Sequence, residues 1–189
     1  VKASQESLKK REGGIIWHTQ GSGKSLIMIW LAKWIREKIN DSRVLIITDR
    51  EELDGQIEKF FMGVNETIYR TTSGKDLIEK LDQNTPWLIC SLIHKFRKHD
   101  APDDDYLAEL FSSMKKDFKA KGDVYIFVDE CHRTQSGKLH DAMKKILPNA
   151  VVVGFTGTPL LKTDKQTSLE KFGKYIHTYK YDEAVEDKV

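Results

Sequence analysis

Residues 19–25, with the sequence TQGSGKS, contain the residue types that a phosphate-binding loop requires. Such a loop needs backbone N–H groups turned inward, a helix N-terminus behind them, one cation, and one hydroxyl that can ligate magnesium. Lys24 can reach β- and γ-phosphates, and Ser25 can ligate Mg²⁺. The predicted nucleotide contacts are Thr19, Gln20, Gly21, Ser22, Gly23, Lys24 and Ser25.

His18 occupies the first position of the pattern G-x-x-x-x-G-K-[ST], where a glycine is usual. That position begins the turn out of the preceding strand and lies farther from the phosphates than Gly23. A residue other than glycine is therefore tolerable there if its φ is negative. The same letters also fit a flexible surface turn, so a second site has to decide between the two interpretations.

The segment VYIFVDECH, residues 124–132, supplies that second site. A buried apolar strand delivers two carboxylates at its carboxyl end, which is where ligands bind open α/β sheets. We expect Asp129 to hold the Mg²⁺ shell and Glu130 to polarise the water that attacks the γ-phosphate. In the usual layout of such proteins this strand runs beside the strand that precedes the phosphate loop. The alternative is a solvated turn.

Three further side chains are candidates at the same edge of the sheet. His132 can sense the γ-phosphate or link the site to the end of the next strand, although a lone histidine is more often structural. Thr156 and Thr158, in GFTGTP (154–159), can report the nucleotide state, although this cluster is first of all a good turn.

Short β-rich runs alternate with helical segments along the chain, which predicts a mostly parallel sheet flanked by helices on both faces. The runs are residues 14–17, 43–48, 67–71, 87–92, 124–129 and 150–156. A helix is predicted from Lys24 to about Ile39. Its predicted buried stripe is Ile27, Trp30, Leu31, Trp34 and Ile35. A second stripe, Leu139, Ala142, Met143, Ile146 and Leu147, ends at Pro148.

Composition limits the possible partners and compartments. The chain has 189 residues, enough to form one hydrophobic core. Its formal net charge is only +2, so it is not a polycation that binds nucleic acid non-specifically over its whole surface. Cys90 and Cys131 lack metal-ligand spacing and abut apolar runs, as buried thiols in a reducing cytosol do. No apolar run is long enough to span a bilayer and no signal peptide is recognisable, so a soluble, membrane-free, cytoplasmic domain is predicted.

The segments HTQGSGKS, ITDREELDGQ, VDECHRTQ and FTGTPL together resemble the motors of superfamily 2 helicases, with DECH as a variant of the DEAH box. The fuller run GGIIWHTQGSGKSLIMIWLA, with DECHRTQSGKL and GFTGTPL, is similar to the R (HsdR) subunit of bacterial and archaeal type I restriction-modification enzymes. The His-Thr-Gln form of the loop is characteristic of that family. The resemblance therefore implies that a histidine at this position is the usual form of the motif in that family.

The resemblance implies a RecA-like P-loop NTPase fold and an ATP- and Mg²⁺-dependent translocase of double-stranded DNA within a site-specific endonuclease complex. Its implied partners are the methyltransferase and specificity subunits. The implied organisation is an upstream connection over 1–12 and the first motor domain over 13–172. Residues 173–189, which look less regular than the sheet region, would begin a connection to a second motor domain absent from this sequence.

In the family a nuclease domain lies upstream and the second motor domain, which carries an arginine finger, lies downstream. Neither is found in these residues. Loss of such an arginine costs about 10³ to 10⁵ in rate in related systems. We therefore expect this chain alone to bind nucleotide weakly and to hydrolyse it very slowly.

DNA contacts are expected in loops at the carboxyl ends of strands, where hydroxyls, lysines and amides grip phosphates without reading sequence. The candidates are Asp49, Arg50, Thr72, Ser73, Lys75, His94, Lys95 and Arg97. Each is as compatible with a solvated loop. Residues 94–105 form the clearest long loop, and its aspartates suit the start of a helix near Tyr106 better than a metal site.

Two alternative functions remain open at this stage. One is another superfamily 2 motor, such as an RNA helicase or a chromatin-remodelling ATPase. The other is a non-catalytic docking module with a vestigial nucleotide site. The presence of Lys24, Ser25, Asp129 and Glu130 argues against the module, because a degenerate site would be expected to have lost at least one of them.

Overall fold

The computed structural model of the chain describes residues 1–19, 21–48, 51–63, 66–92, 104–132, 134–158 and 168–186. The helices are α1 (Lys2–Lys9), α2 (Lys24–Lys38), α3 (Glu51–Met62), α4 (Gly74–Leu81), α5 (Asp104–Ser113), α6 (Thr134–Ile146) and α8 (Tyr181–Glu186). The strands are β1 (Gly14–His18), β2 (Ser42–Thr48), β3 (Tyr69–Arg70), β4 (Leu88–Leu92), β5 (Asp123–Val128), β6 (Val151–Thr156) and β7 (Tyr175–Tyr179).

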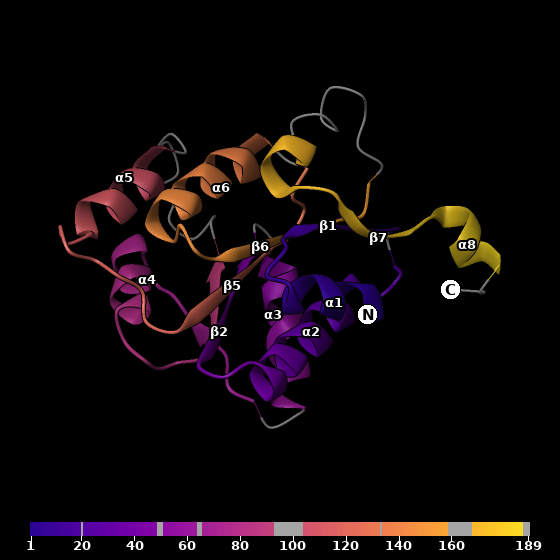
Figure 1. Cartoon of the computed structure of the whole chain (residues 1–189), viewed down its shortest axis with the longest axis horizontal. Helices are drawn as coiled ribbons and strands as arrows, with labels where there is room; N and C mark the ends of the chain where they lie inside the picture. The colour runs from indigo at the N-terminus through magenta and orange to yellow at the C-terminus, as the bar shows by residue number, and fades with distance from the viewer. Residues whose placement is uncertain are drawn as a thin grey trace.

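The strands form one seven-stranded sheet in the order β3-β4-β2-β5-β6-β1-β7, and every pairing between them is parallel (Figure 1). Helices α1, α2 and α3 cover one face of the sheet, and α4, α5 and α6 cover the other. The hydrophobic core accordingly consists of two layers. Apolar strands buried on both faces require this three-layer arrangement, which confirms the predicted fold class. The strand expected over 67–71 is shorter, because only two residues pair with β4.

Helix α2 confirms the predicted helix but not its predicted buried face. Its buried residues are Met28, Ile29, Leu31, Ala32 and Ile35. Trp30, which was placed in the stripe, is 57% exposed. The helix is apolar around much of its surface, so two overlapping stripes share Leu31 and Ile35, and packing on the sheet selects the stripe with the smaller side chains. On α6 and the turn that follows, Ala142, Met143, Ile146 and Leu147 are buried as predicted, and the side chain of Leu139 lies outside the described part of the chain.

Strand β5 does not lie beside β1 as the sequence interpretation assumed. Strand β6 runs between them, with Ile16 of β1 opposite Phe155 and Phe127 of β5 opposite Val153. All residues of β6 are buried, so this strand needs neighbours on both sides. The loops after β1 and β5 are consequently separated by the end of β6, where Thr156 lies.

The C-terminal segment is more regular than its composition suggested. Residues 175–179 form β7, which extends the sheet by pairing with β1, and α8 follows directly. Every residue of β7 is only partly buried, as an edge strand allows, and this weakens the apolar signal that identified the other strands. Helix α1 packs against both β7 and α2.

Cys90 and Cys131 are buried, as predicted, and neither forms a disulfide bond. Within the described residues, no helix has the length and apolar character needed to cross a membrane.

Candidate active site

The carboxyl ends of β1, β6 and β5 bring together three segments that are far apart in the sequence. Because the three strands are parallel neighbours, residues 18–25, 156–158 and 129–132 follow them at the same edge of the sheet. This edge is where open α/β sheets bind ligands. The predicted phosphate loop, the two carboxylates and the threonine turn therefore belong to one site.

The phosphate loop has the backbone that a phosphate cradle needs. Gly21 and Gly23 have φ values of 85° and 76°, a left-handed conformation that favours glycine. The Ser22 hydroxyl donates to the carbonyl oxygen of Thr19 at 2.6 Å, which tightens the turn. Helix α2 begins at Lys24, directly behind the loop, and so directs its N-terminal amides toward it. Gln20 lies outside the described residues.

Lys24 lies against the first residues of the loop. Its Nζ donates to the carbonyl oxygens of His18 at 3.3 Å and Thr19 at 3.4 Å. A methyl group at Gly157 would come within 2.7 Å of the same nitrogen. Lys24 is thus held between the loop and the turn after β6. A phosphate oxygen would compete well for this ammonium, because hydrogen bonds to charged acceptors are stronger than those to carbonyls.

Asp129 and Glu130 are each only 6% exposed, so the carboxylates do not belong to a solvated turn. The Asp129 amide donates to Ile47 on β2, and the Cys131 amide donates to Phe155 on β6, both at 2.9 Å. Between these two bonds Glu130 has a φ of 46°, which is uncommon for a residue with a side chain. Such backbone strain is typical of functional positions.

His132 links this carboxylate turn to the end of β6. Its Nδ1 lies 2.8 Å from Thr156 Oγ1 and 3.4 Å from a carboxylate oxygen of Glu130. Thr156 Oγ1 also accepts from the Thr158 amide and donates to the Thr158 carbonyl, each at 3.3 Å. Two roles were considered for His132, sensing the γ-phosphate and linking the site to the next strand, and these contacts agree with the second. They connect Glu130 through His132 and Thr156 to the backbone of Thr158.

His18 has a negative φ, because the only described residues other than glycine with a positive φ are Arg11, Asp41 and Glu130. The condition for a histidine at the first loop position is therefore met. The ring of His18 is 7% exposed, and its Nε2 lies 2.9 Å from His177 Nδ1 on β7. Burial, followed by the nearby His177, lowers the pKa of His18 to about 4. Sequence reasoning missed His177, because no local pattern indicates which strand lies beside β1.

Ser25 and Asp129 are the residues that fit a magnesium ion. Mg²⁺ prefers hard oxygen ligands and commonly takes one or two from protein, leaving the rest to water and phosphate. A hydroxyl at the start of α2 and a buried carboxylate at the end of β5 match that preference. Consistent with so sparse a ligand set, the described residues contain no cluster of three or more His, Cys, Asp or Glu suited to a metal.

The DNA candidates in the described residues are Thr72, Ser73 and Lys75, at the start of α4. The Thr72 amide and hydroxyl donate to Asp76, and the Ser73 hydroxyl caps the helix by accepting from the Asp76 amide. These polar atoms already have roles within α4. Asp49, Arg50, His94, Lys95 and Arg97 lie outside the described residues.

The N-terminus of α4 also receives a carboxylate from α5. Amides of Gly74 and Lys75 donate to the two oxygens of Glu109, at 3.1 and 3.4 Å. The Lys75 side chain is 69% exposed and lies 3.8 Å from Glu79. Only this side chain, and not the amides behind it, is directed to solvent.

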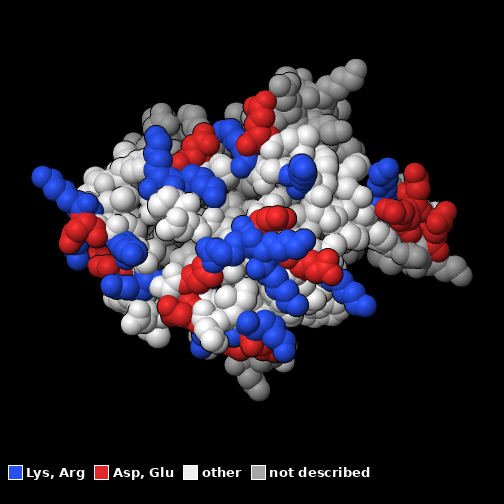
Figure 2. All heavy atoms as spheres, viewed as in Figure 1, with Lys and Arg blue, Asp and Glu red and all other residues white. Residues whose placement is uncertain are grey.

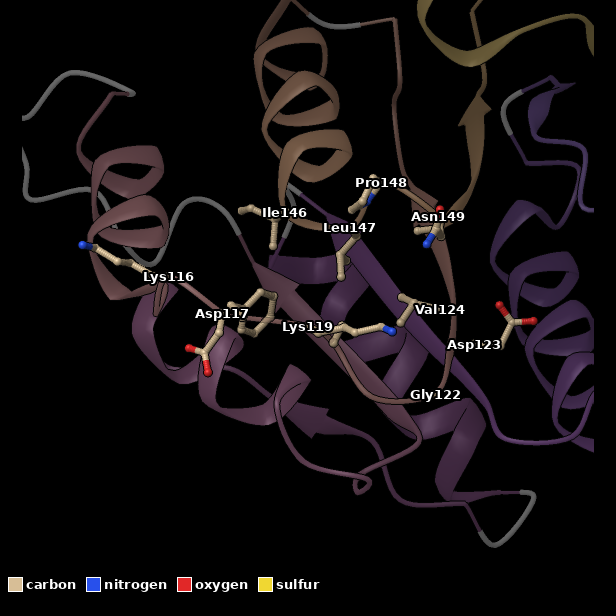
Figure 3. Close-up of a pocket in the computed structure, with 13 residues that line it drawn as sticks. Lys116, Asp117, Lys119, Gly122, Asp123, Val124, Ile146, Leu147, Pro148 and Asn149 are labelled. Carbon is tan, nitrogen blue, oxygen red and sulfur yellow. The ribbon is translucent and has the colours of Figure 1, made fainter.

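A cavity of about 480 Å³ lies elsewhere, between the segments 116–124 and 146–150 (Figure 3). These segments precede β5 and β6, so the cavity is at the amino edge of the sheet, opposite the phosphate loop. It is not part of the candidate active site.

On the face shown in Figure 2, basic side chains gather near the centre with acidic ones around them, in agreement with the small net charge of +2.

Comparison with known proteins identifies the family to which the chain is similar. The family model of the SWI2/SNF2 ATPase matches residues 1–189. A type I restriction enzyme endonuclease subunit of Staphylococcus aureus, SauMSSORF170P, is 30% identical over 191 residues, covering 97% of this chain and 19% of the relative. A putative type I restriction enzyme endonuclease subunit of Methanocaldococcus jannaschii, MjaIXP, is 33% identical over 182 residues, covering 95% of this chain and 16% of the relative. The chain thus spans less than a fifth of these proteins.

Solved structures share the fold at low sequence identity. The Hef helicase domain of Pyrococcus furiosus has a TM-score of 0.63 and 15% identity, covering 95% of this chain and 38% of that one. The Sulfolobus solfataricus SWI2/SNF2 ATPase core, solved in complex with dsDNA, has a TM-score of 0.59 and 16% identity, covering 90% of this chain and 34% of that one.

Proposed function

Because the chain belongs to the SWI2/SNF2 ATPase family, we propose that it is the first RecA-like motor domain of a type I restriction enzyme R subunit. In that subunit it would bind ATP with Mg²⁺ and couple hydrolysis to translocation of double-stranded DNA before cleavage. The similarity to restriction subunits over 95% or more of this chain supports the assignment. The methyltransferase and specificity subunits are the proposed partners.

The observation that carries this proposal is the meeting of three segments at one sheet edge. The phosphate loop lies beside the turn after β6, which in turn contacts the buried carboxylate turn through His132 and Thr156. A site that had lost its chemistry would have no need to bury two carboxylates and strain the backbone between them. This favours catalysis over the docking-module alternative.

Each residue has a proposed role in that chemistry. The loop amides and Lys24 bind the phosphates, and Ser25 and Asp129 hold the metal. Bound Mg²⁺ neutralises charge on the phosphate oxygens. Glu130 accepts the proton of the attacking water, and its burial among protein atoms keeps competing bulk water away. His132, in contact with both Glu130 and Thr156, carries the state of the γ-phosphate to the end of β6.

The domain bounds are also proposals. We assign residues 13–172 to the motor domain, residues 1–12 to an upstream connection, and residues 173–189 to the start of the connection to a second motor domain. Both connections contain an element that packs on the motor domain. Helix α1 of the upstream connection contacts β7, and β7 of the downstream connection extends the sheet by pairing with β1.

Calorimetric titration with Mg·ATPγS tests the nucleotide site directly. We expect saturable binding by the chain and its loss in Lys24→Ala, while Lys33→Ala, on the same helix but outside the loop, serves as the matched control. Equal binding by the chain and Lys24→Ala would overturn the assignment of the loop. In the full-length protein we expect Glu130→Gln to retain binding and lose DNA-stimulated hydrolysis. Unchanged hydrolysis would exclude Glu130 as the base.

A further inference from the structure

Strand β7 contacts the start of the phosphate loop through both backbone and side chains. The amide of Thr19, the first residue of the loop, donates to the Tyr179 carbonyl at 3.0 Å. One residue earlier, the buried ring of His18 contacts His177 through Nε2 and Nδ1 at 2.9 Å. The ring of Tyr179 lies 5.5 Å from that of His18, centroid to centroid. The last residues of β7 thus enclose His18 and Thr19.

The two residues that β7 holds are also those on which Lys24 rests. The carbonyl oxygens of His18 and Thr19 accept hydrogen bonds from Lys24 Nζ, and the Thr19 carbonyl accepts from Ser22 as well. The position of one short backbone segment therefore sets both the shape of the loop and the resting place of the phosphate-binding cation. A shift of β7 must move that segment, because Thr19 is bonded on its amide side to β7 and on its carbonyl side to the loop.

We infer that His177 is a positioning residue of the nucleotide site, which acts through His18 to hold the phosphate loop against β7. The inference rests on the proposed function, since it concerns the same loop. The contact with His177 suits this task because the His18 ring is buried and makes few hydrogen bonds. His18 Nδ1 has no hydrogen-bond partner among the described residues, so the bond between Nε2 and His177 is the only hydrogen bond of the ring there. Removing that contact leaves a buried polar ring without a hydrogen bond to any described residue.

The surroundings of His18 lower the pKa of its ring to about 4, so the ring is neutral at pH 7. Burial is the main cause, and His177 of β7, the amine of Val1 before α1 and Lys24 of α2 lower the pKa further, while Glu183 of α8 raises it. Glu183 also accepts from the Lys180 amide at 2.7 Å, which fixes the turn from β7 into α8.

The decisive variants are His177→Phe, which keeps a ring but removes the hydrogen-bonding nitrogen, and His177→Asn, whose side-chain amide offers an oxygen acceptor or a nitrogen donor the same number of bonds from Cα as Nδ1. Thr178→Val, a near-isosteric change on the same strand, is the matched control. In the 189-residue chain, we expect His177→Phe to accelerate exchange of the Thr19 amide hydrogen roughly tenfold, the effect of one lost buried hydrogen bond. His177→Asn should restore slow exchange, and Thr178→Val should not alter it.

Nucleotide affinity supplies the second readout. We expect His177→Phe to weaken Mg·ATPγS binding several-fold while His177→Asn and Thr178→Val bind like the unaltered chain. If the exchange of Thr19 and the affinity are unchanged in His177→Phe, the inference is overturned even though the nucleotide site is sound. If the unaltered chain and Lys24→Ala show the same lack of binding, the proposed function fails instead. The exchange measurement still decides whether His177 holds the loop, because it requires no nucleotide.

Discussion

Nδ1 of His132 and Oγ1 of Thr156 lie 2.8 Å apart, and this hydrogen bond joins the carboxylate turn after β5 to the end of β6. Thr156 is fully buried and pairs in the sheet with Trp17, just before the phosphate loop. His132, which contacts Glu130, is thereby connected to β6, the strand that pairs with β1 just before the phosphate loop.

Thr156→Val should uncouple hydrolysis from nucleotide binding. The substitution preserves shape but leaves His132 and the Thr158 amide without the hydroxyl that both contact. In the full-length protein we expect kcat for ATP hydrolysis to fall roughly tenfold or more, the cost of an unsatisfied buried group, with little change in nucleotide affinity. Thr178→Val, the same change on β7 and outside this chain of contacts, is the control. Equal kcat in both variants would argue against coupling through Thr156.

Glu130→Gly should make the domain more stable and inactive. Glu130 has a φ of 46°, and relief of such strain is worth about 1 kcal/mol or more, less the greater freedom of glycine in the unfolded chain. We therefore expect a higher urea midpoint together with loss of hydrolysis. Glu130→Gln, which loses the carboxylate but retains the strain, should not show the full gain. A lower midpoint for Glu130→Gly would show that the side chain stabilises the turn more than its conformation costs.

The stability of the domain should fall as the pH is lowered from about 6.5 toward 4. Burial first, then His177, lowers the pKa of His18 to about 4 from the ordinary histidine value of 6.5. Between these values the unfolded chain binds a proton that the folded protein does not, so acid favours unfolding. The slope from this group is on the order of 1 kcal/mol per pH unit, and the effect is absent above the unfolded value.

Urea unfolding of the chain and of His18→Asn across this pH range measures the contribution. The slope should be shallower in the variant. His140→Asn is a second test of the same effect: burial also lowers the pKa of His140, on the opposite face of the sheet, so this variant should have a shallower slope too. An identical slope in the chain and in His18→Asn would show that His18 titrates normally.

Arg43→Lys should destabilise the fold without altering the nucleotide site. Arg43 is 2% exposed, and burial lowers the pKa of its guanidinium. The guanidinium donates to backbone carbonyls of Lys80, Leu81, Gln83, Pro86 and Lys121. Lysine cannot reach these acceptors with its three donors, so a loss of roughly 3 kcal/mol is expected in the free energy of unfolding.

Arg36→Lys, at an exposed position of α2, provides the comparison for that loss. Nucleotide affinity of the folded Arg43→Lys protein should match that of the unaltered chain, because these carbonyls lie at the amino edge of the sheet. A change in affinity at equal fold content would mean that the two edges are coupled.

The sequence alone determined the class of the fold and predicted the chemistry of the site. A phosphate loop needs glycine, lysine and a hydroxyl at fixed spacing, and Gly21, Gly23, Lys24 and Ser25 meet this requirement within a few residues. Strands such as β2 and β6 are mostly apolar because both of their faces are buried, which predicts parallel pairing. Both signals are local, so no knowledge of distant contacts is needed to recognise them.

Only the tertiary structure decided which distant segments meet. Strand order depends on packing between elements far apart in the chain, so the place of β6 between β1 and β5, and of β7 at the other side of β1, could not be deduced from runs of apolar residues. For the same reason His177 was invisible as a neighbour of His18. The carboxylate of Glu109 on the α4 amides was equally unforeseen, because a residue's position after a strand does not reveal what another helix places against it.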